Sequence, residues 1–312
     1  MASLRVAMKG HSFRKKFLIG VSGGRDSMVL LDALGRLGFR NLVVCHIDHT
    51  LRGRSSLADA RLVKRTAERA GLALESARCR TAEYASKTQK SIELAARELR
   101  QAFFRECAAR HRCHRLLLAH HADDQVETCL FNFLRGSGAS GLGGMRKSSK
   151  LGQLETSRPF LNVSRDQIIA YQIKYKVAYR EDATNEETRY TRNKIRHQVL
   201  PSIAEAMGES FREAVLRASF ILSEEEDWMN SMVPPVGHEL SCADLREMHP
   251  ALQARTVLRW LRERGIEEPG FEETRRVLTL LDVANGPAKI NLPGGIHARR
   301  RAGVLFLEGE WI

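Results

Sequence analysis

The stretch of the chain best suited to chemistry follows an apolar run and precedes an apolar-periodic one, and it reads Ser22-Gly23-Gly24-Arg25-Asp26-Ser27. A strand that turns into a helix leaves the first backbone N–H groups of that helix without partners, and such groups bind anions. The two glycines let a phosphate approach the backbone, the two serines add hydroxyl donors, and Asp26 can hold a metal ion or orient a nucleophile. An ordinary strand–turn–helix corner would also contain adjacent glycines, and the dinucleotide-binding and Walker spacings are absent.

Two further polar clusters each follow a strand-like run. In one, strand alternation places His46 and Asp48 on the same face, with His49 directly after them. In the other, Asp124 and Glu127 are three positions apart, so they share one face of a helix in its first turn. Carboxylates there gain from the helix dipole, but four acidic or imidazole groups within residues 120–124 exceed what capping requires. We therefore expect a cation nearby, either Mg²⁺ or a substrate amine; zinc fits less well because no thiolate lies at ligand spacing.

The strand-like runs that carry these clusters alternate with helical patterns. The runs are Phe17–Val21, Leu42–Ile47 and Leu116–Ala119. This alternation predicts an α/β fold with a doubly wound, mostly parallel sheet and helices on both faces. In such a sheet ligands bind at the carboxyl ends of the strands, so the three clusters are expected to form one site.

Local signals predict how the chain continues after the third strand. Asp123 is placed to cap a helix, and Ser164 with Gln167 forms a capping box that opens another. Five glycines between Gly136 and Gly144 predict a mobile loop. The apolar pattern from about Ser202 to Trp228 predicts one long helix.

The pattern also predicts the division into domains. Residues 1–215 are expected to form the catalytic domain, 216–240 a helix and linker that includes Pro234-Pro235, and 241–312 a small C-terminal α+β domain. The small domain is expected to combine short helices with two alternating segments, namely Ala243–Met248, Leu252–Glu263, Glu272–Leu281, Lys289–Leu292 and Val304–Leu307.

Composition points to a polyanionic partner. The 312-residue chain has 50 Lys and Arg against 37 Asp and Glu, a formal net charge of +13. Such a field attracts nucleic acid, although a basic surface can also serve solubility alone. No apolar run approaches the length that a bilayer requires, and the six cysteines include no Cys-x-x-Cys pair. We therefore expect a cytoplasmic protein with reduced thiols and no membrane partner.

Several motifs occur together and in a fixed order, and they extend well beyond the phosphate-binding stretch. They are Ser22–Ser27, the His46-x-Asp48-His49-x-Leu51-Arg52 block, His120-His121-x-Asp123-Asp124-x-x-Glu127-Thr128, Arg135-Gly136 with Gly141-Leu142-x-Gly144-Met145, Arg158-Pro159, and Asp182-x-x-Asn185 with Tyr190-x-Arg192-Asn193-x-Ile195-Arg196. In these motifs the chain resembles the tRNA(Ile)-lysidine synthetases, a family within the PP-loop ATP pyrophosphatases. The resemblance covers roughly Phe17 to Pro201, and the tail resembles the first C-terminal domain of that family, while the second one of its longer members is not expected here.

The resemblance implies an ATP-dependent ligase of tRNA processing. Enzymes of this family adenylate O2 of the wobble cytidine in the CAU anticodon of tRNA(Ile), then attach free L-lysine at C2 and release AMP, which forms lysidine. The cofactors implied are ATP and Mg²⁺. The sequence leaves open whether the chain forms a homodimer.

The resemblance also assigns roles to residues. It implies that ATP is bound by Ser22, Gly23, Gly24, Arg25, Asp26 and Ser27, with Asp26 as the metal ligand. It implies that Asp124 and Glu127 recognise the lysine ammonium group, and that His49 and Arg192 belong to the catalytic set. Four arginines are expected to contact phosphates of ATP or the anticodon stem-loop, namely Arg52, Arg135, Arg192 and Arg196. Asn193 either reads the cytosine edge or caps a helix.

Three other functions compete with this interpretation. A tRNA cytidine thiolase of the same superfamily would need Cys-x-x-Cys pairs for an iron–sulfur cluster, whereas Cys107 and Cys113 are six positions apart. An amidotransferase would need a glutaminase nucleophile, and no N-terminal cysteine is present. A non-catalytic RNA-binding protein would need only the basic charge and would not require acidic and histidine clusters after three strands.

Overall fold

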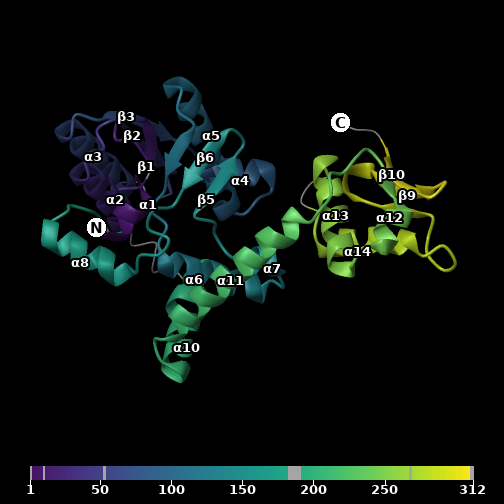
Figure 1. Cartoon of the computed structure of the whole chain (residues 1–312). Helices are drawn as coiled ribbons and strands as arrows, with labels where there is room; N and C mark the ends of the chain where they lie inside the picture. The colour runs from purple at the N-terminus through teal and green to yellow at the C-terminus, as the bar shows by residue number, and fades with distance from the viewer. Residues whose placement is uncertain (1, 10, 52–53, 182–190, 267–268, 310–312) are drawn as a thin grey trace. The chain divides into compact units, whose positions relative to one another are not determined.

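The computed structural model describes residues 2–9, 11–51, 54–181, 191–266 and 269–309. The chain divides into two compact units, Met1–Ser223 and Glu224–Ile312. The first unit contains a six-stranded sheet and the second a four-stranded sheet (Figure 1).

The large sheet has the strand order β3-β2-β1-β4-β6-β5. All neighbours pair in parallel except β5 and β6, which are antiparallel. This confirms the predicted doubly wound, mostly parallel α/β fold. The strands are β1 (Phe17–Gly20), β2 (Leu42–Asp48), β3 (Ala73–Arg78), β4 (Arg115–Leu117), β5 (Ser148–Leu151) and β6 (Leu154–Ser157).

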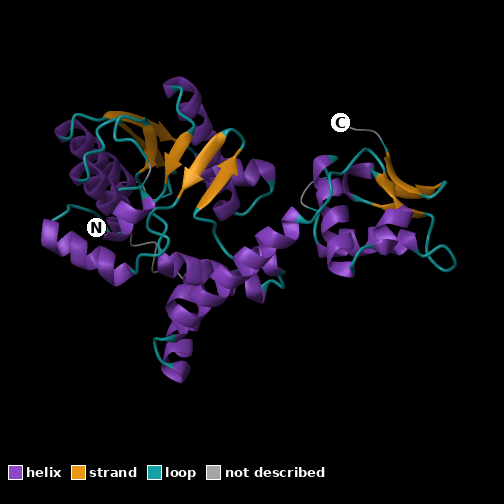
Figure 2. Ribbon diagram, viewed as in Figure 1, coloured by secondary structure: helices purple, strands orange, loops and turns teal. Residues whose placement is uncertain are grey.

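Helices cover both faces of this sheet because successive strand side chains point to opposite sides. Ile19 and Val44 belong to the core cluster that α2, α3 and α8 close, whereas Leu18 and Val43 belong to the cluster that α5 closes. Figure 2 shows the sheet between these helical layers. The helices that accompany the sheet are α1 (Ala2–Ala7), α2 (Arg25–Arg36), α3 (Arg54–Arg69), α4 (Thr81–Thr88), α5 (Ile92–His111) and α8 (Arg165–Tyr175).

A second group of helices in this unit packs around Val126, Ile195, Leu200 and Phe211, all of which are buried. Ile195 begins a π-helix, which is a wide helical turn common at functional sites. The helices that contribute to this cluster are α6 (Ala122–Leu134), the π-helix (Ile195–Val199), α10 (Leu200–Met207) and α11 (Phe211–Ser231), whose last turns belong to the second unit. Two short helices lie next to them in the chain, α7 (Ala139–Leu142) and α9 (Thr191–Lys194).

Two of the predicted segments were wrong. The single helix from Ser202 to Trp228 is two helices, because Gly208 ends α10 with a positive φ of 78°. The segment Gly136–Gly144 was predicted as a mobile loop, but it contains the short helix α7. Two side-chain amides bind its backbone. Asn132 Nδ2 donates to Gly141 O at 2.6 Å, and Gln125 Nε2 donates to Gly143 O at 3.0 Å. These partners come from α6 and could not be inferred from the glycines alone.

The second unit has its own core around Trp260, which donates a hydrogen bond from Nε1 to His238 O at 3.1 Å. Its sheet has the order β7-β10-β9-β8, with antiparallel neighbours throughout. The elements are β7 (Leu240–Ser241), α12 (Cys242–Glu247), α13 (Pro250–Glu263), α14 (Phe271–Leu278), two 3₁₀ turns (Thr279–Leu281 and Pro293–Gly295), β8 (Lys289–Asn291), β9 (His297–Arg301) and β10 (Val304–Glu308). Over the parts of the chain that the structure describes, no helix combines the length and apolar character needed to traverse a bilayer.

Candidate active site

The strand order reverses between β1 and β4, which lie side by side in the centre of the sheet. From β1 the chain continues outward to β2 and β3, whereas β4 begins the other half of the sheet. A crevice for ligands forms outside the carboxyl ends of strands at such a point. The Ser22–Ser27 turn follows β1, and the His121 cluster follows β4, so the fold brings the first and third predicted clusters to the same carboxyl edge of the sheet.

The turn after β1 is held by its own serine hydroxyls. Ser27 Oγ donates to Gly24 O at 3.0 Å and accepts from the backbone N of Ser22 at 3.2 Å. Ser22 Oγ accepts from the backbone N of Gly24 at 3.2 Å. Gly23 has a φ of 93°, a conformation that favours glycine, and a Cβ there would lie 3.3 Å from Asp59 Cβ. The two serines therefore shape the loop that precedes α2, with Gly24 as its N-cap.

Residues from a distant segment support this loop. Arg180 donates its backbone N–H to Gly23 O at 3.0 Å and pairs through Nε with Asp59 Oδ1 at 2.8 Å. Arg25, one of the residues predicted to bind ATP, donates to Tyr179 OH at 2.6 Å and to Glu181 Oε1 at 2.8 Å. Its guanidinium also stacks 4.5 Å above the Tyr179 ring. These partners lie about 155 positions from the loop in sequence, which is why no local signal identifies them.

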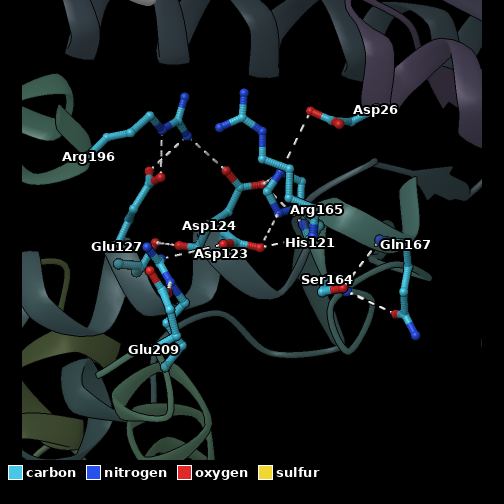
Figure 3. A network of polar contacts seen from close by, with 12 residues as sticks. Asp26, His121, Asp123, Asp124, Glu127, Ser164, Arg165, Gln167, Arg196 and Glu209 are labelled. Carbon is cyan, nitrogen blue, oxygen red and sulfur yellow. Dashed lines mark hydrogen bonds and ion pairs between the residues drawn. The ribbon is translucent and has the colours of Figure 1, made fainter. Parts of the chain in front are cut away.

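His121 lies between Asp26 and the carboxylates of α6 and so links the two halves of the polar network (Figure 3). Its buried ring places Nε2 3.6 Å from both Asp26 Oδ2 and Asp124 Oδ2, and Nδ1 3.6 Å from Asp123 Oδ2. Burial lowers the pKa of His121, but contact with Asp26 and the charges of Asp124 and Asp123 raise it above its ordinary value overall. The imidazole is therefore held toward its protonated form among three carboxylates.

Asp26 is the exposed member of this group. Its side chain is 40% exposed, whereas that of His121 is 5% exposed. Burial raises the pKa of Asp26, yet its contact with His121 and the charges of Arg165 and Arg25 lower it below the ordinary value. Asp26 is thus an ionised carboxylate that faces solvent in the Ser22–Ser27 turn. One carboxylate next to a phosphate site is the kind of donor set that Mg²⁺ uses, since this ion takes most of its remaining ligands from phosphates and water.

The predicted pair of carboxylates on α6 is confirmed as neighbouring, and the structure adds a cation to it. Arg196 Nε donates to Glu127 Oε1 at 2.6 Å, and Arg196 Nη2 donates to Glu127 Oε2 at 2.9 Å and to Asp124 Oδ1 at 3.2 Å (Figure 3). Burial raises the pKa of Glu127, and the Arg196 hydrogen bonds offset this only in part. Arg196 was predicted as a phosphate contact; here its guanidinium binds carboxylates.

Asp123 was predicted as a helix cap for α6, and this was wrong. His121 occupies the N-cap position, and Asp123 Oδ2 instead accepts from the backbone N of Arg165 at 3.0 Å, at the start of α8. Asp124 Oδ2 satisfies the backbone N of His121 at 3.0 Å. The two carboxylates therefore hold the beginnings of two helices while they surround the imidazole.

The second predicted cluster, after β2, makes structural contacts. His46 Nδ1 donates to Val21 O at 2.8 Å, and Asp48 Oδ1 accepts from the backbone N of Thr50 at 2.8 Å. His49 Nδ1 lies 2.9 Å from Thr81 Oγ1, at the start of α4. These contacts join the end of β2 to Val21, which directly follows β1, and to Thr81 at the start of α4.

The remaining predicted residues that the structure describes lie at the end of α6 and on α9. Arg135 and Arg192 are exposed and lie over the ring of Phe131, at 5.1 Å and 5.8 Å from its centroid. Asn193 is partly buried on α9. Four motif residues fall outside the described residues, namely Arg52, Asp182, Asn185 and Tyr190.

Comparison with known proteins agrees with this geometry. Residues 3–203 match the family described as the PP-loop domain, and residues 240–306 match the TilS substrate binding domain. A tRNA(Ile)-lysidine synthase from Solibacter usitatus is 34% identical over 308 residues, which cover 92% of this chain and 67% of that protein. The chain belongs to the tRNA(Ile)-lysidine synthase family. A second lysidine synthase, from Chlorobaculum tepidum, is 37% identical over 238 residues that cover 75% of this chain and 68% of that protein.

Other members of the lysidine synthase family are longer than this chain. The aligned region spans 63% of the enzyme from Bacillus licheniformis and 50% of that from Bacillus subtilis, at 33% and 35% identity over 91% and 74% of this chain. Among solved structures, the U34-tRNA thiolase NcsA from Methanococcus maripaludis matches with a TM-score of 0.58 at 15% identity, covering 72% of this chain and 78% of that one. At this identity the likeness concerns the fold alone.

Proposed function

We propose that this chain forms lysidine in tRNA(Ile): it activates the wobble cytidine of the CAU anticodon with ATP and then joins free L-lysine to it. The observation that supports this most directly is the position of His121, which lies 3.6 Å both from Asp26 beside the phosphate turn and from Asp124 of the α6 carboxylate pair. A site for ATP and a site for an amine are thereby adjacent, as a two-step ligase requires.

In the first step, O2 of the cytidine attacks the α-phosphorus of ATP, the bond to the bridging oxygen breaks, and pyrophosphate leaves. The N-terminal amides of α2 and the shaped turn Ser22–Ser27 hold the phosphates, since an unpaired helix N-terminus binds anions. The His121 imidazolium adds positive charge at the same edge. Asp26 would hold Mg²⁺, which when bound neutralises phosphate charge.

In the second step, the ε-amine of lysine attacks C2, the C2–O bond breaks, and AMP leaves. Asp124 and Glu127 bind the lysine ammonium group through carboxylate oxygens. In the structure the same oxygens accept hydrogen bonds from Arg196. The attacking amine must be neutral, so one proton has to leave the ammonium group. We assign its acceptance to Glu127, because burial raises the pKa of this carboxyl and makes it the stronger base.

Nucleoside mass analysis tests this proposal. A CAU-anticodon tRNA(Ile) transcript is incubated with the enzyme, ATP and lysine labelled with heavy isotopes, then digested to nucleosides. The proposal expects a cytidine derivative heavier by the labelled lysine, and only when both ATP and lysine are present. A thiolase would give a sulfur-containing cytidine with a sulfur donor instead, and a non-catalytic RNA-binding protein would leave the transcript unchanged; either result would contradict the proposal.

A further inference from the structure

A cavity of about 670 Å³ opens on the first unit between α3 and the segment that follows α8. One wall is formed by α3, and the other by Tyr179 and Arg180. The cavity does not include Asp26, His121 or the α6 carboxylates, so it is separate from the site described above.

The α3 wall is strongly basic because of how this helix is oriented. Its apolar side chains Val63 and Ala67 are fully buried in the core. The residues that line the cavity occupy the exposed side at helical spacing, namely Arg61, Lys64, Arg65 and Glu68. One face of the helix thus presents three cations and one carboxylate to the cavity.

The positive charge of the cavity is only partly compensated. Lys64 Nζ lies 3.8 Å from Glu68 Oε1, and Arg180 pairs with Asp59 at 2.8 Å. Within the described ranges of the chain, Arg61 and Arg65 have no carboxylate partner at ion-pair distance. Exposed arginines that converge on a concavity without counter-ions form a site for phosphate groups.

The other lining residues indicate which phosphate compound fits. Ala58, Leu62 and Tyr179 give the cavity an apolar and aromatic part beside its cations. Nucleic-acid sites combine cations for the backbone with aromatic and apolar surface for bases or sugars. The Tyr179 wall is also continuous with the phosphate turn, because Arg25 stacks on the Tyr179 ring and Arg180 binds Gly23 O.

We propose that this α3 cavity binds a phosphodiester segment of the RNA substrate, outside the nucleotide that reacts. The inference rests on the proposed function for the identity of that RNA. Arg61 and Arg65 contact phosphates, and they position the RNA without taking part in either chemical step.

The test compares two double variants that remove the same charge. Arg61→Ala/Arg65→Ala removes the two cavity arginines, and Arg14→Ala/Arg105→Ala removes two exposed arginines that lie neither on α3 nor in the cavity wall. Binding of a fluorescent CAU-anticodon tRNA transcript is measured by anisotropy over a series of KCl concentrations, and binding of a fluorescent ATP analogue is measured separately. The cavity variant is expected to bind tRNA roughly tenfold more weakly, with a salt slope lower by about 2, since each phosphate contact contributes about 1. The control variant is expected to keep the larger part of its affinity and slope.

Each other outcome overturns the proposal. Equal losses in the two variants would mean that the general field of the protein, and not the cavity, attracts RNA. A loss of affinity for the ATP analogue along with tRNA would make the cavity a polyphosphate site, and unchanged tRNA binding would show that it holds no RNA. These binding measurements involve no catalysis, so they are independent of the lysidine assay. An enzyme that formed no lysidine would refute the proposed function, but RNA binding by the α3 cavity would still be decided by the binding measurements.

Discussion

Arg196 binds Glu127 through two parallel hydrogen bonds, from Nε at 2.6 Å and from Nη2 at 2.9 Å, although the two residues are 69 positions apart. The side chain of Glu127 is 8% exposed and that of Arg196 is 29% exposed. The π-helix Ile195–Val199 carries Arg196, and its first residue, Ile195, packs beside Val126 of α6. The pair therefore joins α6, which carries the carboxylates, to the π-helix. Such helices are rare and occur mostly at functional sites.

Replacement of Arg196 by Met should destabilise the first unit in a pH-dependent way. Without Arg196, the buried carboxylate of Glu127 has no strong partner, and removal of one member of a buried pair costs roughly 3 kcal/mol. The folded-state pKa of Glu127 then rises further above its ordinary value of 4.5. A carboxyl group whose pKa is higher in the folded than in the unfolded state destabilises the protein at pH values above the unfolded pKa and has no effect well below it. The loss of unfolding free energy in Arg196→Met should therefore be large at pH 7.5 and small near pH 4.5.

Urea unfolding at these two pH values measures the effect. The double variant Glu127→Gln/Arg196→Met is the matched control. It removes the buried charge of Glu127 and leaves only the more exposed Asp124 without Arg196, so it should lose less stability with a weaker dependence on pH. A single variant whose stability loss was the same at both pH values would show that Arg196 does not compensate the charge of Glu127.

The imidazole of His121 should titrate above its ordinary value of 6.5. Burial lowers the pKa of His121, but contact with Asp26 and the charges of Asp124 and Asp123 raise it by a larger amount. Asp26→Asn removes one of these charges without changing the shape of the side chain, so it should lower the pKa of His121. An NMR titration of the histidine ring resonances measures this, with His121→Gln to assign the signal and Glu83→Gln, on the exposed face of α4, as the control. An unchanged pKa in Asp26→Asn would mean that the two groups do not interact.

The raised pKa of His121 should also make the stability of the protein depend on pH. A histidine with a raised folded pKa stabilises the protein below its unfolded pKa, and this contribution is lost as the pH rises through the folded value. The difference in unfolding free energy between the unmodified protein and His121→Gln should therefore shrink as the pH is raised from 6 to 9. A difference that grew over this range would contradict a protonated His121.

Gly23 and Gly24 should respond differently to the same change. Gly23→Ala places a Cβ on a residue with a φ of 93°, 3.3 Å from Asp59 Cβ, and should cost about 1 to 3 kcal/mol of stability. Gly24 has an ordinary φ of −72°, and its added Cβ would meet only the Ser22 hydroxyl, at 3.3 Å. Thermal unfolding of the two variants should show the larger loss for Gly23→Ala. Equal losses would indicate that the conformation of the turn is set elsewhere.

Sequence patterns predicted the parts of this structure that local chemistry determines. The helices that carry Asp26 and Glu127 begin after strands that the hydrophobic runs predicted, and the Ser164–Gln167 capping box is present with both of its hydrogen bonds. Each of these depends on residues within a few positions of one another. Their convergence followed from the rule that parallel strands share one carboxyl edge.

The partners of the site could not be predicted in this way. Nothing in the sequence shows which segment will face Glu127. Arg196 was therefore expected to bind a phosphate, and its contact with Glu127 was not predicted. His121 was not distinguished from His120, since the irregular backbone after β4 gives no alternation to follow. Tyr179, Arg180 and Asp59, which support the phosphate turn, are positioned only by the packing of α3 and α8 against the sheet.

If ATP and lysine bind in adjacent halves of one site, substitutions in the two halves should stop different steps of the reaction. Asp26→Asn and Glu127→Gln are each supplied with CAU-anticodon tRNA, ATP and lysine, and AMP-linked tRNA and lysidine are measured in the same quenched reactions. We expect Asp26→Asn to form neither product, whereas Glu127→Gln should accumulate AMP-linked tRNA and form lysidine at least 10-fold more slowly. Loss of adenylation to the same degree in both variants, or lysidine formation at the unmodified rate in Glu127→Gln, would contradict this expectation.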